Sequence, residues 1–150
     1  MKKLIIMRGI PGTGKSTYVR TNYPNAIVCS ADDYFDEVAA LNGTSYEEEF
    51  QPWLMGKAHQ HCWYKFIHAV CVMDAPLVVV DNTNTNKWEY ENYVFLANVA
   101  IGSINRPEDC YEVIIVDMPF DPELAEVYCE RNTHGVPLES IQRLIDNYEH

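Results

Sequence analysis

The sequence predicts an α/β fold in which a parallel sheet of about four strands is covered by helices on both faces. Short apolar runs rich in β-branched residues alternate with longer helical segments, an order typical of parallel sheets. The runs are residues 3–8, 26–29, 77–81 and 111–116. The run 77–81 is apolar until its last residue, as in a strand buried on both faces. At 150 residues, the chain is expected to form a single domain, 1–150, with a sizeable core.

Helices are expected between and after these strands. Their ranges are 15–22, a short helix after Ser30, 53–73, 87–100, 123–131 and 137–148. Ser30 suits an N-cap, and Pro52 and Pro137 suit a first helical turn. Apolar residues at helical spacing predict a buried stripe of Ala58, Cys62, Phe66, Ala69 or Val70, and Met73. The stretch 45–49 is expected to be polar surface, and loops are expected at 42–45, 82–86, 102–107 and 132–136.

A phosphate-binding motif follows the first strand and opens the first helix. Residues 9–17 read Gly-Ile-Pro-Gly-Thr-Gly-Lys-Ser-Thr and fit G-x-x-x-x-G-K-[ST]. Glycines let backbone N–H groups face phosphate oxygens, while Lys15 contacts the β- and γ-phosphates and the Ser16 hydroxyl ligates Mg²⁺. The motif predicts a nucleoside triphosphate site with ATP and Mg²⁺ as cofactors. The residues expected at the nucleotide are Gly9, Pro11, Gly12, Thr13, Gly14, Lys15, Ser16 and Thr17.

Three carboxylates follow strands of the predicted sheet, where ligands of open α/β folds bind. Asp81 closes the apolar run 77–81, the position of a Walker-B carboxylate that holds Mg²⁺; a cap for the following turn is its alternative role. Asp32 and Asp33 follow the second strand, and one of them can take the proton of an acceptor hydroxyl. Helix N-terminal residues favoured by the helix dipole are the alternative for this pair. Two adjacent aspartates point in different directions, so at most one is expected to be the base.

A lid is predicted near the end of the chain. Arg131 ends a predicted helix and precedes a loop that contains Gly135. An arginine there can close on the phosphates and stabilise charge during transfer. A cation at a helix C-terminus is the simpler interpretation.

Charge and cysteine content exclude several classes of protein. The chain has 22 acidic and 11 basic residues and a net charge of −11. Such a chain is not expected to grip long duplex nucleic acid, although a small basic pocket for one strand end or one nucleotide is compatible. Five scattered cysteines indicate reduced thiols and a cytoplasmic protein. No apolar run approaches a membrane span, and the first strand begins almost at Met1, so neither membrane nor secretory segments are expected.

The order of these motifs resembles the 5′-kinase domain of phage polynucleotide kinase. The shared features are Gly-x-Pro-Gly-x-Gly-Lys-Ser-Thr, Asp-Asp-Tyr, Thr-Asn after a strand, and Arg-Asn…Val-Pro before a last helix. The likeness is closer still to a polynucleotide-kinase-like subgroup often described only as AAA-type ATPases. The signatures of this subgroup here are residues 30–35, 58–59, 80–84 with Trp88, and 131–136.

The resemblance implies a P-loop kinase fold with a short C-terminal lid. It implies that Lys15 and Ser16 serve ATP and Mg²⁺, that Asp32 is the general base, and that Arg131 belongs to the lid over ATP. It places these residues on the acceptor side: Asp33, Phe35, Asn82, Thr83, Asn84 and His134. In the phage enzyme an arginine that holds the acceptor phosphate occupies the place of Phe35, and the lid carries a further arginine where this shorter lid offers His134.

Three functions are compatible with these observations. The first is an ATP-dependent transfer of the γ-phosphoryl group to a 5′-hydroxyl end of DNA or RNA, with a single-stranded end as partner. The second keeps this chemistry with a nucleoside, nucleotide or other small metabolite as acceptor, which the acidic surface and Phe35 favour. The third is an ATP-hydrolysing switch or binding module that grips a protein partner, whose identity the sequence does not indicate.

Overall fold

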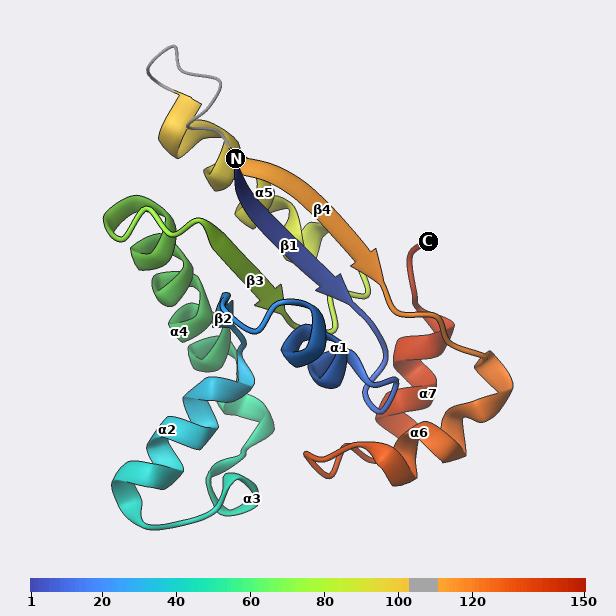
Figure 1. The fold of residues 1–150 in the computed structure, drawn as a ribbon. Coiled ribbons are helices and arrows are strands. Elements are labelled where there is room, and N and C mark those ends of the chain that lie inside the picture. Colours follow the sequence, from blue (N-terminus) through green and yellow to red (C-terminus); the bar gives the residue numbers. More distant parts are fainter. Residues whose placement is uncertain (103–110) are drawn as a thin grey trace.

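The predicted parallel sheet of four strands is confirmed. The computed structural model describes residues 1–102 and 111–150. Its strands are β1 Lys2–Arg8, β2 Ile27–Cys29, β3 Leu77–Asp81 and β4 Tyr111–Asp117, and they pair in the parallel order β2-β3-β1-β4. Because all four strands run the same way, their carboxyl ends meet at one edge of the sheet (Figure 1). The loops that follow them are therefore brought together.

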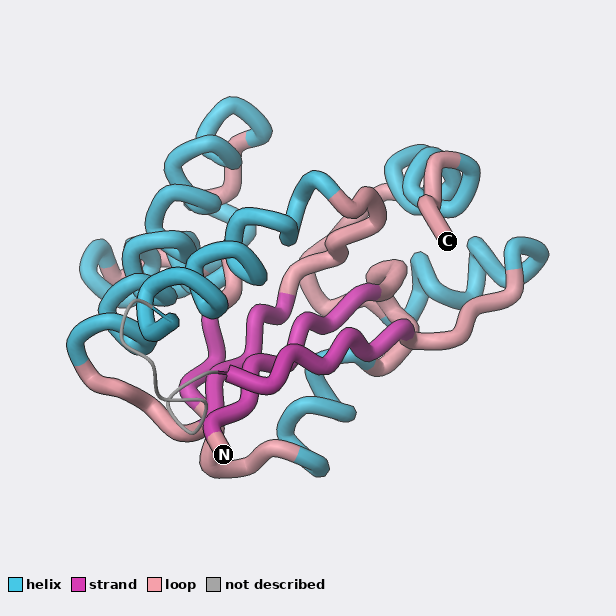
Figure 2. Tube along the Cα trace, turned by 90° about the horizontal axis from the view of Figure 1, so that it is seen from above, coloured by secondary structure: helices cyan, strands magenta, loops and turns pink. Residues whose placement is uncertain are grey.

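Helices surround the sheet. They are α1 Lys15–Asn22, α2 Asp32–Asn42, α3 Tyr46–Glu49, η1 Pro52–Leu54, α4 Met55–Ile67, the π-helical turn η2 His68–Val72, α5 Trp88–Gly102, η4 Pro122–Leu124, α6 Ala125–Arg131 and α7 Leu138–Asp146. Seen from above, helices lie on both sides of the strands (Figure 2). No helix within residues 1–102 and 111–150 is both long and apolar enough to cross a membrane.

The alternation of side chains along β1 divides the core into two layers. Leu4 and Ile6 pack in a large cluster with residues of α2, α4 and α5. Ile5 and Met7 point to the other face, where Val19 of α1 covers them. Residues 4–7 are all fully buried, which is why this strand has no polar residue at its centre.

A third, smaller cluster joins the segment after β1 to the C-terminal helices. Ile10 is fully buried there against Tyr128 of α6 and Ile141 of α7. The two helices pack on each other beside the loop that follows β1 (Figure 1). The predicted phosphate loop therefore has a hydrophobic anchor of its own.

The structure departs from the predicted helices at three places. Met73, expected in the buried stripe, is 54% exposed, because the π-helical turn η2 shifts the spacing that keeps Ala69 and Val70 buried. The helix after Ser30 is not short, and its N-cap is Ala31 rather than Ser30: α2 runs over 11 residues until Gly43 ends it in a left-handed conformation. The stretch 45–49 contains α3, opened by a capping box between Ser45 and Glu48. Most of the expected 102–107 loop lies outside the described residues.

Candidate active site

The loop between β1 and α1 has the backbone geometry of a phosphate cradle. Gly12 and Gly14 adopt left-handed φ angles of 87° and 86°, which glycine adopts without steric cost. Gly14 is the N-cap residue of α1 and makes no side-chain cap, so first-turn N–H groups stay available at the positive end of this helix. The loop is held in place by Gly9 N–H, which donates to the Thr83 carbonyl at 2.9 Å, and by Thr13 Oγ1, which donates to the Ile10 carbonyl at 2.7 Å.

Gly12 is required for packing as well as for its φ angle. A Cβ atom at this position would lie 2.2 Å from the backbone oxygen of Tyr128 in α6. That separation is far below van der Waals contact, so a side chain here would push the loop away from α6. The phosphate loop is thus docked on the helix that carries the predicted lid.

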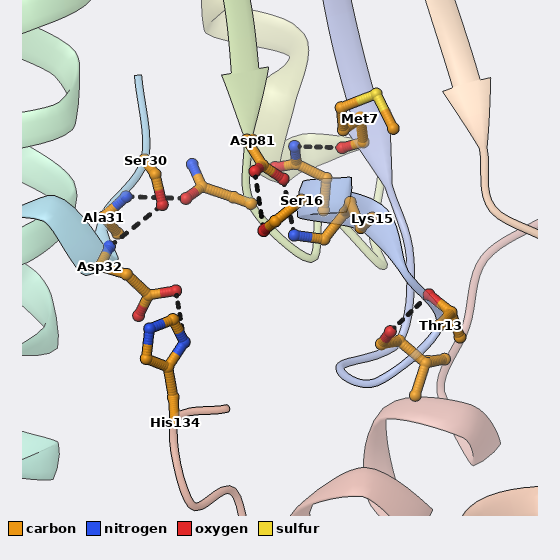
Figure 3. Close-up of polar contacts among 12 residues, drawn as sticks. Met7, Thr13, Lys15, Ser16, Ser30, Ala31, Asp32, Asp81 and His134 are labelled. Carbon is orange, nitrogen blue, oxygen red and sulfur yellow. Dashed lines mark hydrogen bonds and ion pairs between the residues drawn. The ribbon is translucent and has the colours of Figure 1, made fainter. Parts of the chain in front are cut away.

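Lys15, Ser16 and Asp81 form the polar centre of the site (Figure 3). Lys15 Nζ lies 2.7 Å from Asp81 Oδ1, and Ser16 Oγ donates to Asp81 Oδ2 at 3.3 Å. The side chains of Lys15 and Asp81 are only 14% and 8% exposed, which strengthens their attraction.

The donor set around Asp81 fits Mg²⁺. A hydroxyl and a carboxylate are hard oxygen ligands, and Mg²⁺ is commonly held by one or two such protein groups together with substrate phosphates. Within the described residues no group of three or more His, Cys, Asp or Glu side chains is arranged to hold a metal ion without substrate. By the chemistry of their oxygen atoms, Ser16 and Asp81 are the residues that would hold the ion beside the phosphates.

Asp32 and Asp33 point in different directions. Asp33 Oδ2 accepts from the Ser30 N–H and lies 3.3 Å from Lys65 Nζ of α4. Asp32 points to the other side, where Tyr46 Oη donates to Oδ1 at 2.7 Å. His134 Nδ1 lies 3.4 Å from Asp32 Oδ2 (Figure 3). Of the two carboxylates, Asp32 is the one that faces the C-terminal loop.

Asn82 joins the two acidic parts of the site. Its Oδ1 accepts from the Ala31 N–H at 2.9 Å, and its Nδ2 donates to Cys62 Sγ at 3.6 Å. Burial raises the pKa of the Cys62 thiol, which keeps it neutral as a hydrogen-bonding partner. Because Asn82 follows Asp81 and Ala31 precedes Asp32, this one side chain ties the phosphate cradle to the segment that carries Asp32.

Two residues predicted on the acceptor side, Phe35 and Asn84, have buried side chains. Phe35 is fully buried against Tyr34, Tyr46 and Phe50. Asn84 is 2% exposed and has a φ of 47°. Its Nδ2 donates to the Met7 carbonyl at 2.8 Å, so it shapes the turn after β3 rather than facing an acceptor. Thr83 contributes its carbonyl to the phosphate loop, and its side chain is partly exposed.

The predicted lid is an ordered loop between α6 and α7. Arg131 ends α6 with an exposed side chain, which makes no ion pair or hydrogen bond to residues 1–102 and 111–150. Asn132 organises the loop: its Oδ1 accepts from the Val136 N–H at 2.8 Å, and its Nδ2 donates to the carbonyls of Cys129 and Val136. This closed turn presents His134 toward Asp32.

Tyr46 belongs to the site although the sequence predicted only polar surface at residues 45–49. Burial and the hydrogen bond to Asp32 raise the pKa of Tyr46 above its ordinary value, so the hydroxyl remains a donor. Two signals were available in the sequence. Ser45-x-x-Glu48 is a capping-box pattern, and Phe50 follows Tyr46 at helical spacing.

Arg8 is a further side chain whose contacts the sequence did not reveal. It is 3% exposed at the end of β1. Its Nε donates to the Asn84 carbonyl at 2.8 Å, and one terminal nitrogen donates to the carbonyls of Thr85 and Glu149. The other terminal nitrogen of Arg8, Nη1, lies 3.0 Å from Asp117 Oδ1. Arg8 thereby connects β1, the loop after β3, β4 and the C-terminal segment.

Comparisons with known proteins agree with this geometry. Residues 4–149 match the family model AAA_33, described as an AAA domain. NEDD4-binding protein 2 from Homo sapiens is 32% identical over 154 residues, which span 97% of this chain and 8% of that protein. A crystal structure of a gluconokinase from Sinorhizobium meliloti 1021 aligns with a TM-score of 0.50 at 14% identity, over 99% of this chain and 75% of that chain.

Each comparison supports a different statement. At 14% identity the gluconokinase shows the fold alone, and together with the parallel sheet and the glycine-rich loop it shows a P-loop kinase fold, as predicted. The chain spans 8% of the human relative, so the likeness applies to one part of that protein. Since the family model covers nearly every residue, the chain belongs to the AAA domain family that this model describes.

Proposed function

We propose that this chain is a phosphotransferase that moves the γ-phosphoryl group of ATP to a hydroxyl. The acceptor that we propose first is a 5′-hydroxyl end of DNA or RNA. The observation that carries this proposal is the Asn82 bridge between the segment of Asp32 and the strand end that carries Asp81. This bridge is an argument for a role of the Asp32 carboxylate on the far side of the phosphate cradle, where an acceptor would enter. A nucleotide-binding site alone does not need such a group.

In the proposed reaction the acceptor oxygen attacks the γ-phosphorus. A new P–O bond forms, the bond between the γ-phosphorus and the β,γ-bridging oxygen breaks, and ADP leaves. Asp32 takes the proton of the acceptor hydroxyl. Lys15 and the first N–H groups of α1 offset the negative charge of the phosphates, and Arg131 adds a further cation from the lid.

Mg²⁺ held by Ser16 and Asp81 would neutralise charge on the phosphate oxygens. The chain's own part is to supply two oxygen ligands from different elements. The hydrogen bond between Ser16 and Asp81 keeps these ligands together.

The proposal is tested by transfer from γ-labelled ATP to a 5′-hydroxyl oligonucleotide, with DNA and RNA versions. Lys15→Ala is expected to abolish transfer. Asp32→Asn keeps the shape of the side chain but not its basicity, and is expected to lower kcat by about 100-fold or more with ATP affinity retained. Asp33→Asn is the matched comparison, because its carboxylate faces Lys65. An enzyme that binds ATP but labels no DNA or RNA end would contradict the polynucleotide proposal.

A small-molecule acceptor is the second candidate. The net charge of −11 and the burial of Phe35, where the phage enzyme has an arginine, favour an acceptor with fewer phosphates than a strand end. ADP release across a panel of nucleosides, nucleotides and other metabolites would identify it. The third candidate is an ATP-dependent switch that binds a protein partner; the name of the human relative refers to NEDD4 binding. A switch predicts that Asp32→Asn leaves function intact while Lys15→Ala destroys it.

A further inference from the structure

Both oxygens of the Asp32 carboxylate are engaged by residues to which the proposed reaction assigns no role. Tyr46 Oη donates to Oδ1 at 2.7 Å, a short and strong hydrogen bond. His134 Nδ1 lies 3.4 Å from Oδ2. The first contact comes from α3 and the second from the loop between α6 and α7. Asp32 is thus the point at which two distant parts of the chain meet.

The position of Tyr46 is set by the core. Its ring packs edge-on against the fully buried Phe35, with ring centroids 5.4 Å apart, and stacks on Phe50 at 5.8 Å and an interplanar angle of 15°. The capping box of Ser45 and Glu48 fixes the start of the short helix that carries it. With its ring wedged in this way, the hydroxyl has little freedom to leave Asp32.

His134 is presented by an equally ordered loop. The hydrogen bonds of Asn132 close the turn on both sides, and Gly135 supports it with a φ of 66°. The imidazole stacks on the Tyr46 ring, with ring centroids 4.3 Å apart and an interplanar angle of 29°. His134 therefore touches both the carboxylate and the residue that holds it.

We propose that Tyr46 and His134 are positioning residues for Asp32: Tyr46 orients the carboxylate, and His134 joins the 132–136 loop to it so that closure of this loop and alignment of the base occur together. This inference rests on the proposed phosphotransfer. In this proposal, Phe35 packs against the ring of Tyr46 and does not contact an acceptor.

The Asp32 carboxylate retains hydrogen-bonding capacity for an acceptor hydroxyl. At 3.4 Å the contact of His134 is longer than a well-formed N–H···O hydrogen bond, and a carboxylate oxygen has two acceptor sites. With Oδ1 held by Tyr46, Oδ2 keeps a free lone pair that can receive a proton. A carboxylate without the Tyr46 hydrogen bond would rotate among orientations, of which few suit the transfer.

The kinetic test uses variants that remove one contact at a time. Tyr46→Phe keeps the stacking and loses only the hydroxyl; it is expected to lower kcat about tenfold while KM for ATP stays within about twofold. His134→Phe keeps a ring on Tyr46 and loses the polar contact, and is expected to lower kcat by about threefold to tenfold. Thr133→Ala and Glu47→Gln, exposed neighbours of the two residues, are the controls and should match the unmodified chain. An unchanged kcat in Tyr46→Phe overturns the orienting role.

A second measurement follows the loop independently of catalysis. Amide hydrogen exchange of residues 132–136 is expected to speed up by about fivefold to tenfold in Tyr46→Ala and His134→Ala, but not in Thr133→Ala. Unchanged exchange overturns the coupling between loop and base, even if phosphotransfer occurs. If the unmodified chain transfers phosphate to no acceptor while exchange responds as expected, the proposed function fails and the coupling stands.

Discussion

Single glycines decide whether the phosphate loop can form. Gly12 and Gly14 share the same left-handed φ angle, yet their surroundings differ. A Cβ at Gly12 would meet the backbone of Tyr128, whereas a Cβ at Gly14 has no neighbour within 4 Å. Gly14 is therefore needed for its backbone conformation alone, whereas Gly12 is needed both for its conformation and for its close packing on α6.

Gly12→Ala is expected to be more damaging than Gly14→Ala. Backbone strain alone costs about 1–2 kcal/mol in the free energy of unfolding, and the clash of Gly12→Ala with α6 adds about 1–3 kcal/mol. Urea denaturation of both variants measures the difference. Equal destabilisation would contradict the close approach of the loop to α6, while nucleotide binding is expected to suffer in both.

At the scale of elements, the site depends on how the strand ends are joined. Asn82 connects β3 to the start of α2, and Gly9 connects the phosphate loop to the turn after β3. Arg8 also joins separate segments, because its guanidinium donates hydrogen bonds to backbone carbonyls of the loop after β3 and of the C-terminal segment. The rings of Tyr90 and Tyr148 lie 5.3 and 4.7 Å from it.

Arg8→Lys is expected to lower the free energy of unfolding by about 2–4 kcal/mol. A lysine keeps the charge but cannot reach several acceptors in fixed directions, and buried carbonyls would lose their donors. Thermal or urea unfolding checks this, with Arg143→Lys on the exposed side of α7 as the control. A stability equal to that of the control would show that Arg8 acts only through its charge.

At the scale of the whole molecule, one site draws on segments from both ends of the chain. The phosphate loop lies near the N-terminus, Asp81 ends the third strand, and the predicted lid precedes the last helix. A ligand that contacts all of them must stabilise the fold as a unit, because it binds the folded state alone.

ATP with Mg²⁺ at about 100 times its Kd is expected to stabilise the chain by about 2.7 kcal/mol, and so to raise Tm by about 5–10 °C. A chelator that removes Mg²⁺ should reduce this shift, since Ser16 and Asp81 would then contribute nothing to binding. Lys15→Ala should show almost no shift. A full shift in that variant would place the nucleotide elsewhere.

Much of this architecture could be predicted because it depends on local pattern. The apolar composition of the run 77–81 predicts that this strand is buried. The spacing of the glycines predicts the conformation of the phosphate loop. Phe35 and Asn84 could not be placed in this way. Residues beside a functional motif can point into the core or form the turn itself, and the choice depends on neighbours that are distant in sequence, such as Phe50 and Met7.

By itself the sequence determined the α/β class, the parallel order of strand and helix, and the loop that receives phosphates, because periodicity and glycine chemistry act over a few residues. Only the tertiary structure decided which aspartate faces the lid, that Tyr46 and His134 contact Asp32, and that Arg8 joins separate segments of the chain. Their contacts join residues between 14 and 141 positions apart, and such contacts exist only after the sheet has gathered its strand ends at one edge.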